Sequence, residues 1–153
     1  MTGITIVEYT SNHQLDFERL NKHWIEKYFW MEPVDHEVLS KPEEYIINKG
    51  GFIFMATYEN EPAGTVALKF VAEGPYEFTK MAVDEKLQGL KIGKELAAAA
   101  IQKAKEKGAS KIILYSNTKL IAAIALYRKL GFQEVPLDGP YQRSDIKLEL
   151  LLD

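Results

Sequence analysis

Residues 83–100 read VDEKLQGLKIGKELAAAA, and this stretch decides the fold because a strand end, a glycine loop and a helix follow one another in it. A strand-like run precedes a loop that contains Gly89 and Gly93, and the alanine-rich part predicts a helix. We expect no acidic residue in the first turn of this helix, where Lys91 and Lys94 add positive charge. The start of a helix leaves backbone N–H groups unpaired and carries a partial positive charge, so this loop is expected to bind an anion.

The loop by itself supports two interpretations. Its glycines permit a ligand to approach the backbone closely, which suits a phosphate group at the start of a helix. The alternative is that they only ease the turn from strand to helix. The pattern lacks the Gly-Lys-Ser/Thr ending of a Walker A loop and the G-x-G-x-x-G of a dinucleotide fingerprint, so neither class of site is predicted.

Length and composition indicate one globular domain over residues 1–153. The chain has 153 residues and 46% hydrophobic content, which suits a single domain with a sizeable core. Its 19 basic and 22 acidic residues give a net charge of -3, so no overall field attracts nucleic acid or an anionic membrane. The lack of cysteine excludes disulfides, thiolate zinc sites and a cysteine nucleophile. The N-terminus shows no signal pattern and no apolar run is long enough to span a bilayer, so a soluble cytoplasmic protein is expected.

The order of predicted elements is mixed. The expected strands are 4–9, 51–58, 63–73, 76–83, 111–116, 132–137 and 145–152. The expected helices are 15–30, 35–47, the helix that starts in the loop and ends before Gly108, and 120–130. The first hairpin and the strand after it form an antiparallel meander, whereas the strand–helix–strand order of residues 77–116 favours parallel pairing. The sheet is therefore expected to be mixed.

Two stretches resemble a known family. Residues 81–96, MAVDEKLQGLKIGKEL, look like the acyl-CoA signature of the GNAT superfamily of N-acyltransferases. Residues 116–135, SNTKLIAAIALYRKLGFQEV, resemble its second motif, which ends in a Tyr-x-x-x-Gly-Phe pattern at Tyr127, Gly131 and Phe132. The element order also fits, so the resemblance covers essentially the whole chain. It implies an α/β (α+β) fold with a mixed, mostly antiparallel central sheet of about six or seven strands and about four flanking helices.

The resemblance assigns the loop to coenzyme A. The family's Gln/Arg-x-x-Gly-x-Gly/Ala pattern falls on Gln88, Gly89, Leu90, Lys91, Ile92 and Gly93. In the family the pyrophosphate of CoA lies on the backbone N–H groups of this loop, and Lys94 would help to neutralise it. Lys91 stands where the family usually has glycine. If close backbone approach needs that glycine, Lys91 strains the loop; we favour an ordinary backbone, with the ammonium adding a phosphate contact.

The resemblance also places the pantetheine arm of acetyl-CoA, the acyl donor, along residues 80–83. Family members exchange main-chain hydrogen bonds with it there as with an added strand, and Met81 and Val83 are the corresponding positions. This arrangement needs two neighbouring strands to part, exposing backbone groups that would otherwise be unpaired. Asn117 follows the strand 111–116, where its amide either caps the next helix or meets the pantetheine.

The implied reaction is attack of an amine nitrogen on the thioester carbonyl. Tyr127 matches the family tyrosine that protonates the departing thiolate; the alternative is a core tyrosine with a satisfied hydroxyl. Glu77 is the first candidate for the base, because strand alternation places it on one face with Met81 and Val83. An exposed strand carboxylate without that role and a water chain are the alternatives. A backbone N–H near Met81 or Ala82 is the implied oxyanion donor.

The acceptor site is expected among aromatic and charged residues of the first two helices and of the loop before the last strand. The candidates are Trp24, Tyr28, Phe29, Trp30, Asp35, His36, Glu37, Tyr141 and Arg143. Packing is the alternative for Trp24 and Phe29, and a surface salt bridge is the alternative for Arg143. The histidines show no ligand spacing, so no metal is expected.

Two functions follow from these patterns. The first is an N-acetyltransferase that moves an acetyl group from acetyl-CoA to a primary amine of a small molecule or a protein. The second is a non-catalytic acyl-CoA-binding module, in which the phosphate loop works but the acid and base do not. Tyr127 beside an intact second motif favours the enzyme. Neither a nucleic acid nor a membrane is an expected partner, and a homodimer stays open.

Overall fold

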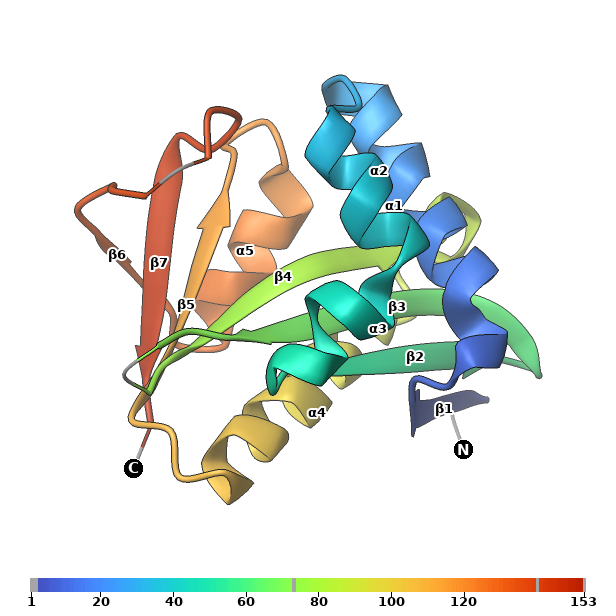
Figure 1. The fold of residues 1–153 in the computed structure, drawn as a ribbon, viewed down its shortest axis with the longest axis horizontal. Helices are drawn as coiled ribbons and strands as arrows, with labels where there is room; N and C mark the ends of the chain where they lie inside the picture. The colour runs from blue at the N-terminus through green and yellow to red at the C-terminus, as the bar shows by residue number, and fades with distance from the viewer. Residues whose placement is uncertain (1–2, 73, 140, 153) are drawn as a thin grey trace.

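The computed structural model describes residues 3–72, 74–139 and 141–152, and within them the chain forms a seven-stranded sheet with helices on both faces (Figure 1). The strands are β1 (Ile4–Glu8), β2 (Phe52–Tyr58), β3 (Glu61–Phe70), β4 (Tyr76–Val83), β5 (Lys111–Ser116), β6 (Gln133–Val135) and β7 (Ile146–Leu151). The α-helices are α1 (Gln14–Tyr28), α2 (Pro33–Ser40), α3 (Pro42–Tyr45), α4 (Ile92–Glu106) and α5 (Ile121–Lys129).

The sheet is mixed and mostly antiparallel. Its strand order is β1-β2-β3-β4-β5-β7-β6, and β4 and β5 form the parallel pair among antiparallel neighbours. The parallel pair follows from the crossover through α4, because a strand that follows a crossover helix re-enters the sheet in the same direction. The expected fold class is therefore confirmed.

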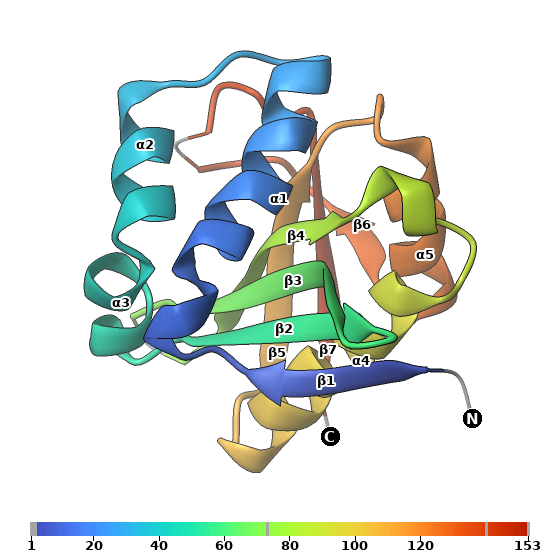
Figure 2. The same cartoon turned by 90° about the vertical axis from the view of Figure 1, so that its right-hand side faces the viewer.

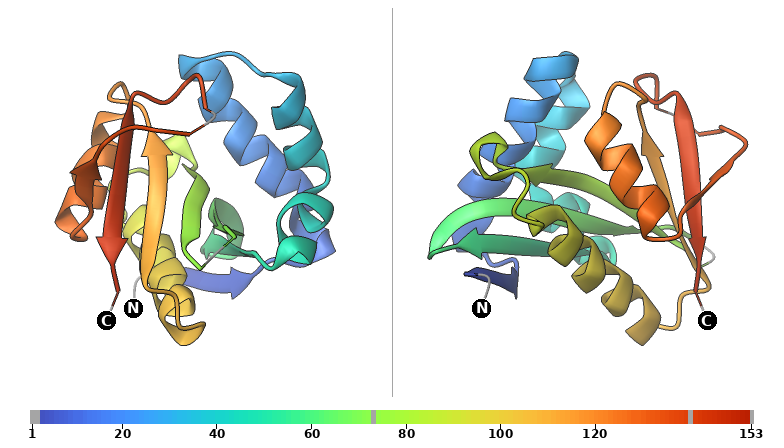
Figure 3. Two further views of the ribbon diagram at one scale, coloured as in Figure 1. Left: turned by 60° about the vertical axis from the view of Figure 1, so that its left-hand side comes forward. Right: turned by 180° about the vertical axis from the view of Figure 1, so that it is seen from behind.

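The helices form a layer on each face of the sheet. α1, α2 and α3 lie on one face, and α4 and α5 lie on the other (Figures 2 and 3). The larger core lies under α4 and α5 and includes Phe78, Leu96 and Tyr127. A smaller core under α1–α3 includes Phe17 and Leu39, both fully buried. The sheet is thus covered on both faces, and the site must be sought where its strands separate.

The expected helix over residues 35–47 is wrong in one respect, because the structure divides it. α2 ends at Ser40 and α3 begins at Pro42, with Lys41 between them at φ -134° and ψ 55°. A proline disfavours the helical conformation of the residue before it, so the chain leaves the helix at Lys41.

The expected turn between β2 and β3 is confirmed. Glu59 and Asn60 have φ values of 50° and 70°, and a two-residue hairpin turn of type I′ requires positive φ at both central residues. β3 ends at Phe70, and residue 73 of the expected strand lies outside the described residues. None of the helices described has the length and apolar character that crossing a membrane demands.

Candidate active site

β4 carries a β-bulge in its middle. The register to β3 shifts by one residue between Thr79 and Ala82, so Lys80 and Met81 lie opposite the single residue Val66. Lys80 has a left-handed φ of 56°, a conformation that residues other than glycine rarely adopt. An extra residue in one strand reverses the alternation of side chains beyond it.

The bulge separates Glu77 from the residues expected beside it. Phe78 belongs to the core under α4 and α5, so strand alternation directs Glu77 to the opposite face. Beyond the bulge, Met81 and Val83 pack against the same core as Phe78. The prediction that Glu77 shares a face with Met81 and Val83 is therefore wrong, because simple alternation does not count the extra residue.

β4 and β5 part at the level of this bulge. In the described chain their pairing covers residues 76–78 of β4 and 112–114 of β5. β4 nevertheless continues to Val83 and β5 to Ser116, and the two strands diverge (Figure 1). The structure therefore contains the separation of neighbouring strands that a ligand needs in order to bind as an added strand.

A cavity of about 190 Å³ lies where the two strands part. Its lining residues are Asn21, Trp24, Ile25, Phe29, Phe78, Thr79, Lys80, Met81, Leu114, Tyr115, Ser116, Asn117, Leu120, Tyr127, Arg143 and Ser144. The cationic side chains in this set are Lys80 and Arg143, and no carboxylate occurs among the described lining residues. The cavity thus offers aromatic and apolar surface with positive charge.

Tyr127 extends from α5 to the cavity. The residue is 7% exposed, and its ring packs edge-on against Phe78 with centroids 5.5 Å apart. Among the described residues its hydroxyl has no hydrogen-bond partner, yet none of their fully buried side-chain polar atoms is left unpaired. The hydroxyl therefore reaches the cavity surface. Burial raises the pKa of Tyr127, so the phenol carries its proton at neutral pH and is available as a donor, although the raised pKa also makes it a weaker acid.

Glu77 lies close to the cavity but outside its lining. The residue is 6% exposed, and its carboxylate accepts hydrogen bonds from the Tyr141 hydroxyl at 3.1 and 3.0 Å. It is therefore not the exposed strand carboxylate of the alternative interpretation. Burial raises the pKa of Glu77, although neighbouring cations oppose part of the increase. A raised pKa makes the carboxylate a stronger base.

The loop before α4 differs from expectation at two residues. Lys91 is the N-cap residue of α4, with φ 69° and ψ 21°, a left-handed conformation that glycine adopts without strain. The prediction of an ordinary backbone at Lys91 is therefore wrong. Glu95 lies in the first turn of α4, so the expected lack of an acidic residue there is also wrong, because the helix begins at Ile92 and its first turn runs to Glu95.

The two loop glycines have different surroundings. A Cβ atom at Gly93 would lie 3.4 Å from Leu126 and 3.7 Å from Met81 and Val83, so this face of α4 packs on α5 and β4. Gly89 has a φ of 88° and open space around it. The backbone is therefore open to a ligand at Gly89, whereas Gly93 lets the helix lie close to the strand. Of the other predicted loop residues, Ile92 is buried, and the exposed ones are Gln88, Leu90, Lys91 and Lys94.

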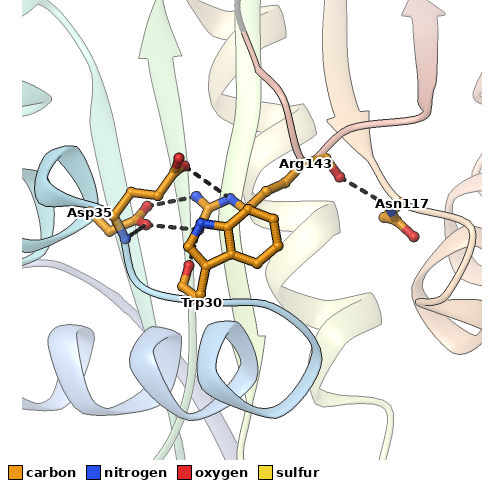
Figure 4. A network of polar contacts seen from close by, with 5 residues as sticks. Trp30, Asp35, Asn117 and Arg143 are labelled. Carbon is orange, nitrogen blue, oxygen red and sulfur yellow. Dashed lines mark hydrogen bonds and ion pairs between the residues drawn. The ribbon is translucent and has the colours of Figure 1, made fainter.

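Asn117 follows β5, and both polar atoms of its side-chain amide form hydrogen bonds within the protein. Its Oδ1 accepts a hydrogen bond from the Lys119 backbone N–H at 2.9 Å, and its Nδ2 donates to the Arg143 carbonyl at 2.9 Å (Figure 4). α5 begins at Ile121 with Leu120 as its N-cap, so Asn117 does not cap that helix. Asn117 lines the cavity and at the same time braces the loop that carries Arg143.

A buried ion pair joins the loop before β7 to α2. Arg143 donates to both carboxylate oxygens of Asp35 at 2.8 Å, and its Nε lies 3.4 Å from Glu32 (Figure 4). The side chain of Asp35 is 2% exposed and that of Arg143 20%. Burial acts to raise the pKa of Asp35, but hydrogen bonds from Arg143 and the Glu32 backbone outweigh it, and the pKa is lowered. Arg143 thus forms a salt bridge, as the alternative interpretation predicted, but its expected place at the surface is wrong, because the pair is buried.

Three of the acceptor candidates line the cavity: Trp24, Phe29 and Arg143. Trp24 donates its indole N–H to the Val83 carbonyl at 2.8 Å, and its ring stacks on Tyr28 with centroids 5.9 Å apart. The candidates outside the described lining are Tyr28, Trp30, Asp35, His36, Glu37 and Tyr141.

Lys80 is among the cavity residues to whose side chains the sequence patterns assign no role, and it is one of the two cationic ones in the described lining. Residues 80–83 were assigned to the pantetheine arm through their backbone, and the lysine itself was given no role. The available signal was a lysine inside a strand whose neighbours Phe78, Met81 and Ala82 are apolar. A charged residue within such a run is a candidate for a functional role, because burial of charge is costly.

Sequence comparisons agree with this geometry. The family model described as the acetyltransferase (GNAT) family matches residues 17–132. An uncharacterised N-acetyltransferase of Bacillus subtilis, YvbK, is 32% identical over 113 residues, which cover 72% of this chain and 73% of that protein. The mycothiol acetyltransferase of Saccharomonospora viridis is 39% identical over 62 residues, which cover 40% of this chain and 20% of that protein.

Solved structures share the fold over nearly the whole chain. An acetyltransferase of the GNAT family from Staphylococcus aureus Mu50 has a TM-score of 0.89 at 24% identity, covering 98% of this chain and 99% of that one. The PaiA N-acetyltransferase of Thermoplasma acidophilum, crystallised with coenzyme A, has a TM-score of 0.75 at 20% identity, covering 97% and 99%. At these identities the likeness establishes the fold.

Proposed function

The chain belongs to the acetyltransferase (GNAT) family, and we propose that it transfers the acetyl group of acetyl-CoA to a primary amine by direct attack in a ternary complex. The observation that carries the proposal is the parting of β4 and β5 at a cavity that the Tyr127 hydroxyl reaches, with no hydrogen-bond partner for it among the described residues. This arrangement leaves room for an amine beside an acyl group and a proton donor.

The residues at the parted strands fit coenzyme A as the carrier of the acyl group. Main-chain groups of Met81 and the N–H of Val83 are the proposed partners of the pantetheine arm, since this part of β4 has separated from β5. The open backbone at Gly89 and the N-terminus of α4 suit the diphosphate, with the exposed Lys91 and Lys94 nearby. When bound, acetyl-CoA supplies the acetyl group as a thioester.

Three groups of the chain have proposed roles in the reaction. Tyr127 gives its proton to the departing thiolate, for which its protonated state and its position at the cavity are suited. Glu77, with its raised pKa, takes a proton from the acceptor ammonium through water. A backbone N–H near Met81 or Ala82, at the end of the bulge, donates to the carbonyl oxygen as negative charge develops there.

Titration calorimetry with acetyl-CoA tests the donor site first, with 3′-dephospho-acetyl-CoA and ATP as controls. We expect selective binding of acetyl-CoA, followed by amine-dependent release of free CoA thiol across a panel of small amines and lysine peptides. Binding without any amine-dependent thiol release would favour the non-catalytic acyl-CoA-binding module. Failure to bind acetyl-CoA would overturn the proposal and would direct attention to Lys91. The homodimer and the cytoplasmic location stay predictions from the sequence.

A further inference from the structure

We propose that Lys80 binds a carboxylate of the acceptor, so that this enzyme acetylates amines that also carry a carboxylate group, as amino acids do. The inference rests on the proposed function and specifies the chemical class of its acceptor. It is carried by the place of Lys80 in the cavity, by the lack of a counter-ion for it among the described residues, and by the charge of the cavity lining.

Lys80 lies in the cavity together with the proposed proton donor. Lys80 and Tyr127 both line it, and Met81, the next residue along β4, does as well. In the described chain, the ammonium of Lys80 forms no hydrogen bond and has no carboxylate oxygen within 4.0 Å. The amine of Lys80 thus borders the space where an acceptor would sit, with no carboxylate partner among the described residues.

The two acidic residues nearest to Lys80 are committed to other groups. The carboxylate of Asp35 is held at both oxygens by Arg143 and accepts a further bond from the Glu32 backbone N–H at 2.8 Å. The carboxylate of Glu77 accepts the hydroxyl of Tyr141. Both carboxylates act on Lys80 electrostatically, but neither has an oxygen within 4.0 Å of its amine. A direct partner of opposite charge would therefore come from a ligand.

The energetics favour an anionic ligand at this position. Burial lowers the pKa of Lys80, and Arg143 and Lys69 act in the same direction, while Asp35 and Glu77 oppose them. An ammonium that is desolvated without a partner raises the free energy of the protein. A carboxylate that enters the cavity removes that penalty by pairing with the ammonium, and the charge-assisted hydrogen bond is stronger in a site with little water.

The backbone of Lys80 supports a functional role. Its φ of 56° places a long side chain at a position of the bulge that glycine would occupy with less strain. Strained residues of this kind are concentrated at active sites and ligand-binding positions. The bulge also sets the direction of this side chain independently of the alternation along β4, so Lys80 can reach the cavity while Met81 packs on the core.

The charge of the cavity argues against a polyamine acceptor. The charged side chains in the described lining are Lys80 and Arg143, and that set contains no aspartate or glutamate. A second ammonium group on the acceptor would therefore meet like charge, whereas a carboxylate would meet Lys80. Arg143 is already paired with Asp35, which leaves Lys80 as the residue that distinguishes the two classes.

Lys80→Met tests the proposal with matched acceptors. Glycine, β-alanine, 4-aminobutyrate and α-amino acids are compared with their carboxamides, which have nearly the same size but no negative charge. We expect the variant to lower kcat/KM for the carboxylates roughly 10- to 100-fold, mainly through KM, and to change the carboxamides less than about twofold. Because a carboxamide also changes the basicity of the amine, the measured quantity is the ratio of the two classes in the variant relative to the wild type.

Two further variants control for structure. Lys80→Arg keeps the charge and should retain most of the preference for carboxylates. Lys105→Met removes an exposed lysine near the end of α4, outside the described cavity lining, and should leave the ratio unchanged. Urea unfolding of all variants checks that the fold is kept. An equal loss for carboxylates and carboxamides in Lys80→Met, or a wild type that prefers carboxamides or polyamines, would overturn the proposal.

A binding measurement separates this proposal from the proposed function. The same carboxylates and carboxamides are titrated by calorimetry into the wild type and Lys80→Met in the presence of CoA. Selective carboxylate binding that the variant loses supports the role of Lys80 even if no thiol is released, in which case the catalytic proposal fails alone. If the enzyme instead turns over amines without preferring those that carry a carboxylate, the catalytic proposal is supported and the proposed role of Lys80 is overturned.

Discussion

The two parts of β4 differ in their neighbours. Residues 76–78 pair with β3 on one side and with β5 on the other, and Tyr76 and Phe78 enter the main core. Residues 79–83 remain beside β3 but have separated from β5, and Lys80 and Met81 border the cavity. One strand thus stabilises the sheet with its first part and presents a binding edge with its second. The bulge therefore marks the boundary between these two roles.

The largest change in the free energy of unfolding is expected at the ion pair that joins the loop before β7 to α2, beside the separated part of β4. Arg143→Met removes the partner of Asp35, which is 2% exposed on its side chain, and leaves a buried carboxylate without its counter-ion. We expect the free energy of unfolding to fall by about 3–5 kcal/mol, measured by urea denaturation. Arg128→Met is the control, because its pair with Glu134 is exposed on both sides and should contribute less than about 1 kcal/mol. Equal losses in the two variants would contradict this interpretation.

The same ion pair predicts a dependence of stability on pH. The pKa of Asp35 is lower in the folded state than its usual 3.8, so the pair contributes fully above that value and its contribution is lost as the pH falls through the folded pKa. Acid titrations of the free energy of unfolding should show this loss in the wild type. In Arg143→Met the loss in the same range should be smaller, and an identical slope in both proteins would count against the pair.

Tyr127→Phe compares catalysis at the open part of β4 with packing at the paired part. The variant removes the hydroxyl at the cavity and keeps the ring on Phe78, so turnover should fall about 100-fold while acetyl-CoA affinity stays nearly constant. Tyr76→Phe, at the paired part, removes another buried tyrosine hydroxyl and should leave turnover unchanged. Thiol-release kinetics measure both. Wild-type turnover in Tyr127→Phe would remove its role as the acid.

Trp24→Phe tests whether its hydrogen bond to Val83 helps to hold α1 against the separated part of β4. The indole N–H donates to the Val83 carbonyl at 2.8 Å, and phenylalanine lacks this donor. We expect a loss of about 1 kcal/mol in the free energy of unfolding. Trp30→Phe is the matched control, since that side chain is 60% exposed and its loss should alter stability by less than about 0.5 kcal/mol. A neutral Trp24→Phe would show that α1 is held by packing alone.

The smallest effect is expected in the loop that follows β4. Lys91→Gly removes the strain of a left-handed φ of 69°, which stabilises the folded state by about 1 kcal/mol. Glycine also gives the unfolded chain more conformational freedom, which lowers the free energy of unfolding by about the same amount. The free energy of unfolding should therefore change by less than about 0.5 kcal/mol. Lys94→Gly, within the first turn of α4, has no such compensation and should cost about 1 kcal/mol. Equal losses would mean that the conformation of Lys91 is not strained.

Local patterns predicted most of the fold. The period of apolar residues placed β4 and β5 at the bounds that the structure shows, and the crossover through α4 implied their parallel pairing. The break between α2 and α3 was missed, although Pro42 supplied a local signal for it. Hydrophobic periodicity follows from burial on one face, which explains why elements are easier to predict than their ends.

The sequence predicted which loop and strand form the site, but it did not predict the direction and the contacts of several side chains in it. The motif containing Gly89 located the start of α4, and Tyr127 reaches the cavity as its motif implied. The bulge at Lys80 depends on the register with β3, and the contact of Arg143 with Asp35 joins residues far apart in the chain. Such features arise from tertiary pairing, which no local periodicity encodes.

The hydrogen bond from Trp24 to the Val83 carbonyl allows the fluorescence of Trp24 to report ligand binding. The chain has two tryptophans, and Trp30→Phe would leave Trp24 as a single fluorophore on the strand edge that the acyl donor is proposed to occupy. A ligand that competes for the Val83 carbonyl changes the surroundings of the indole, so its emission should shift on binding. Stopped-flow fluorescence could then follow the arrival and departure of unlabelled substrates and time them against thiol release.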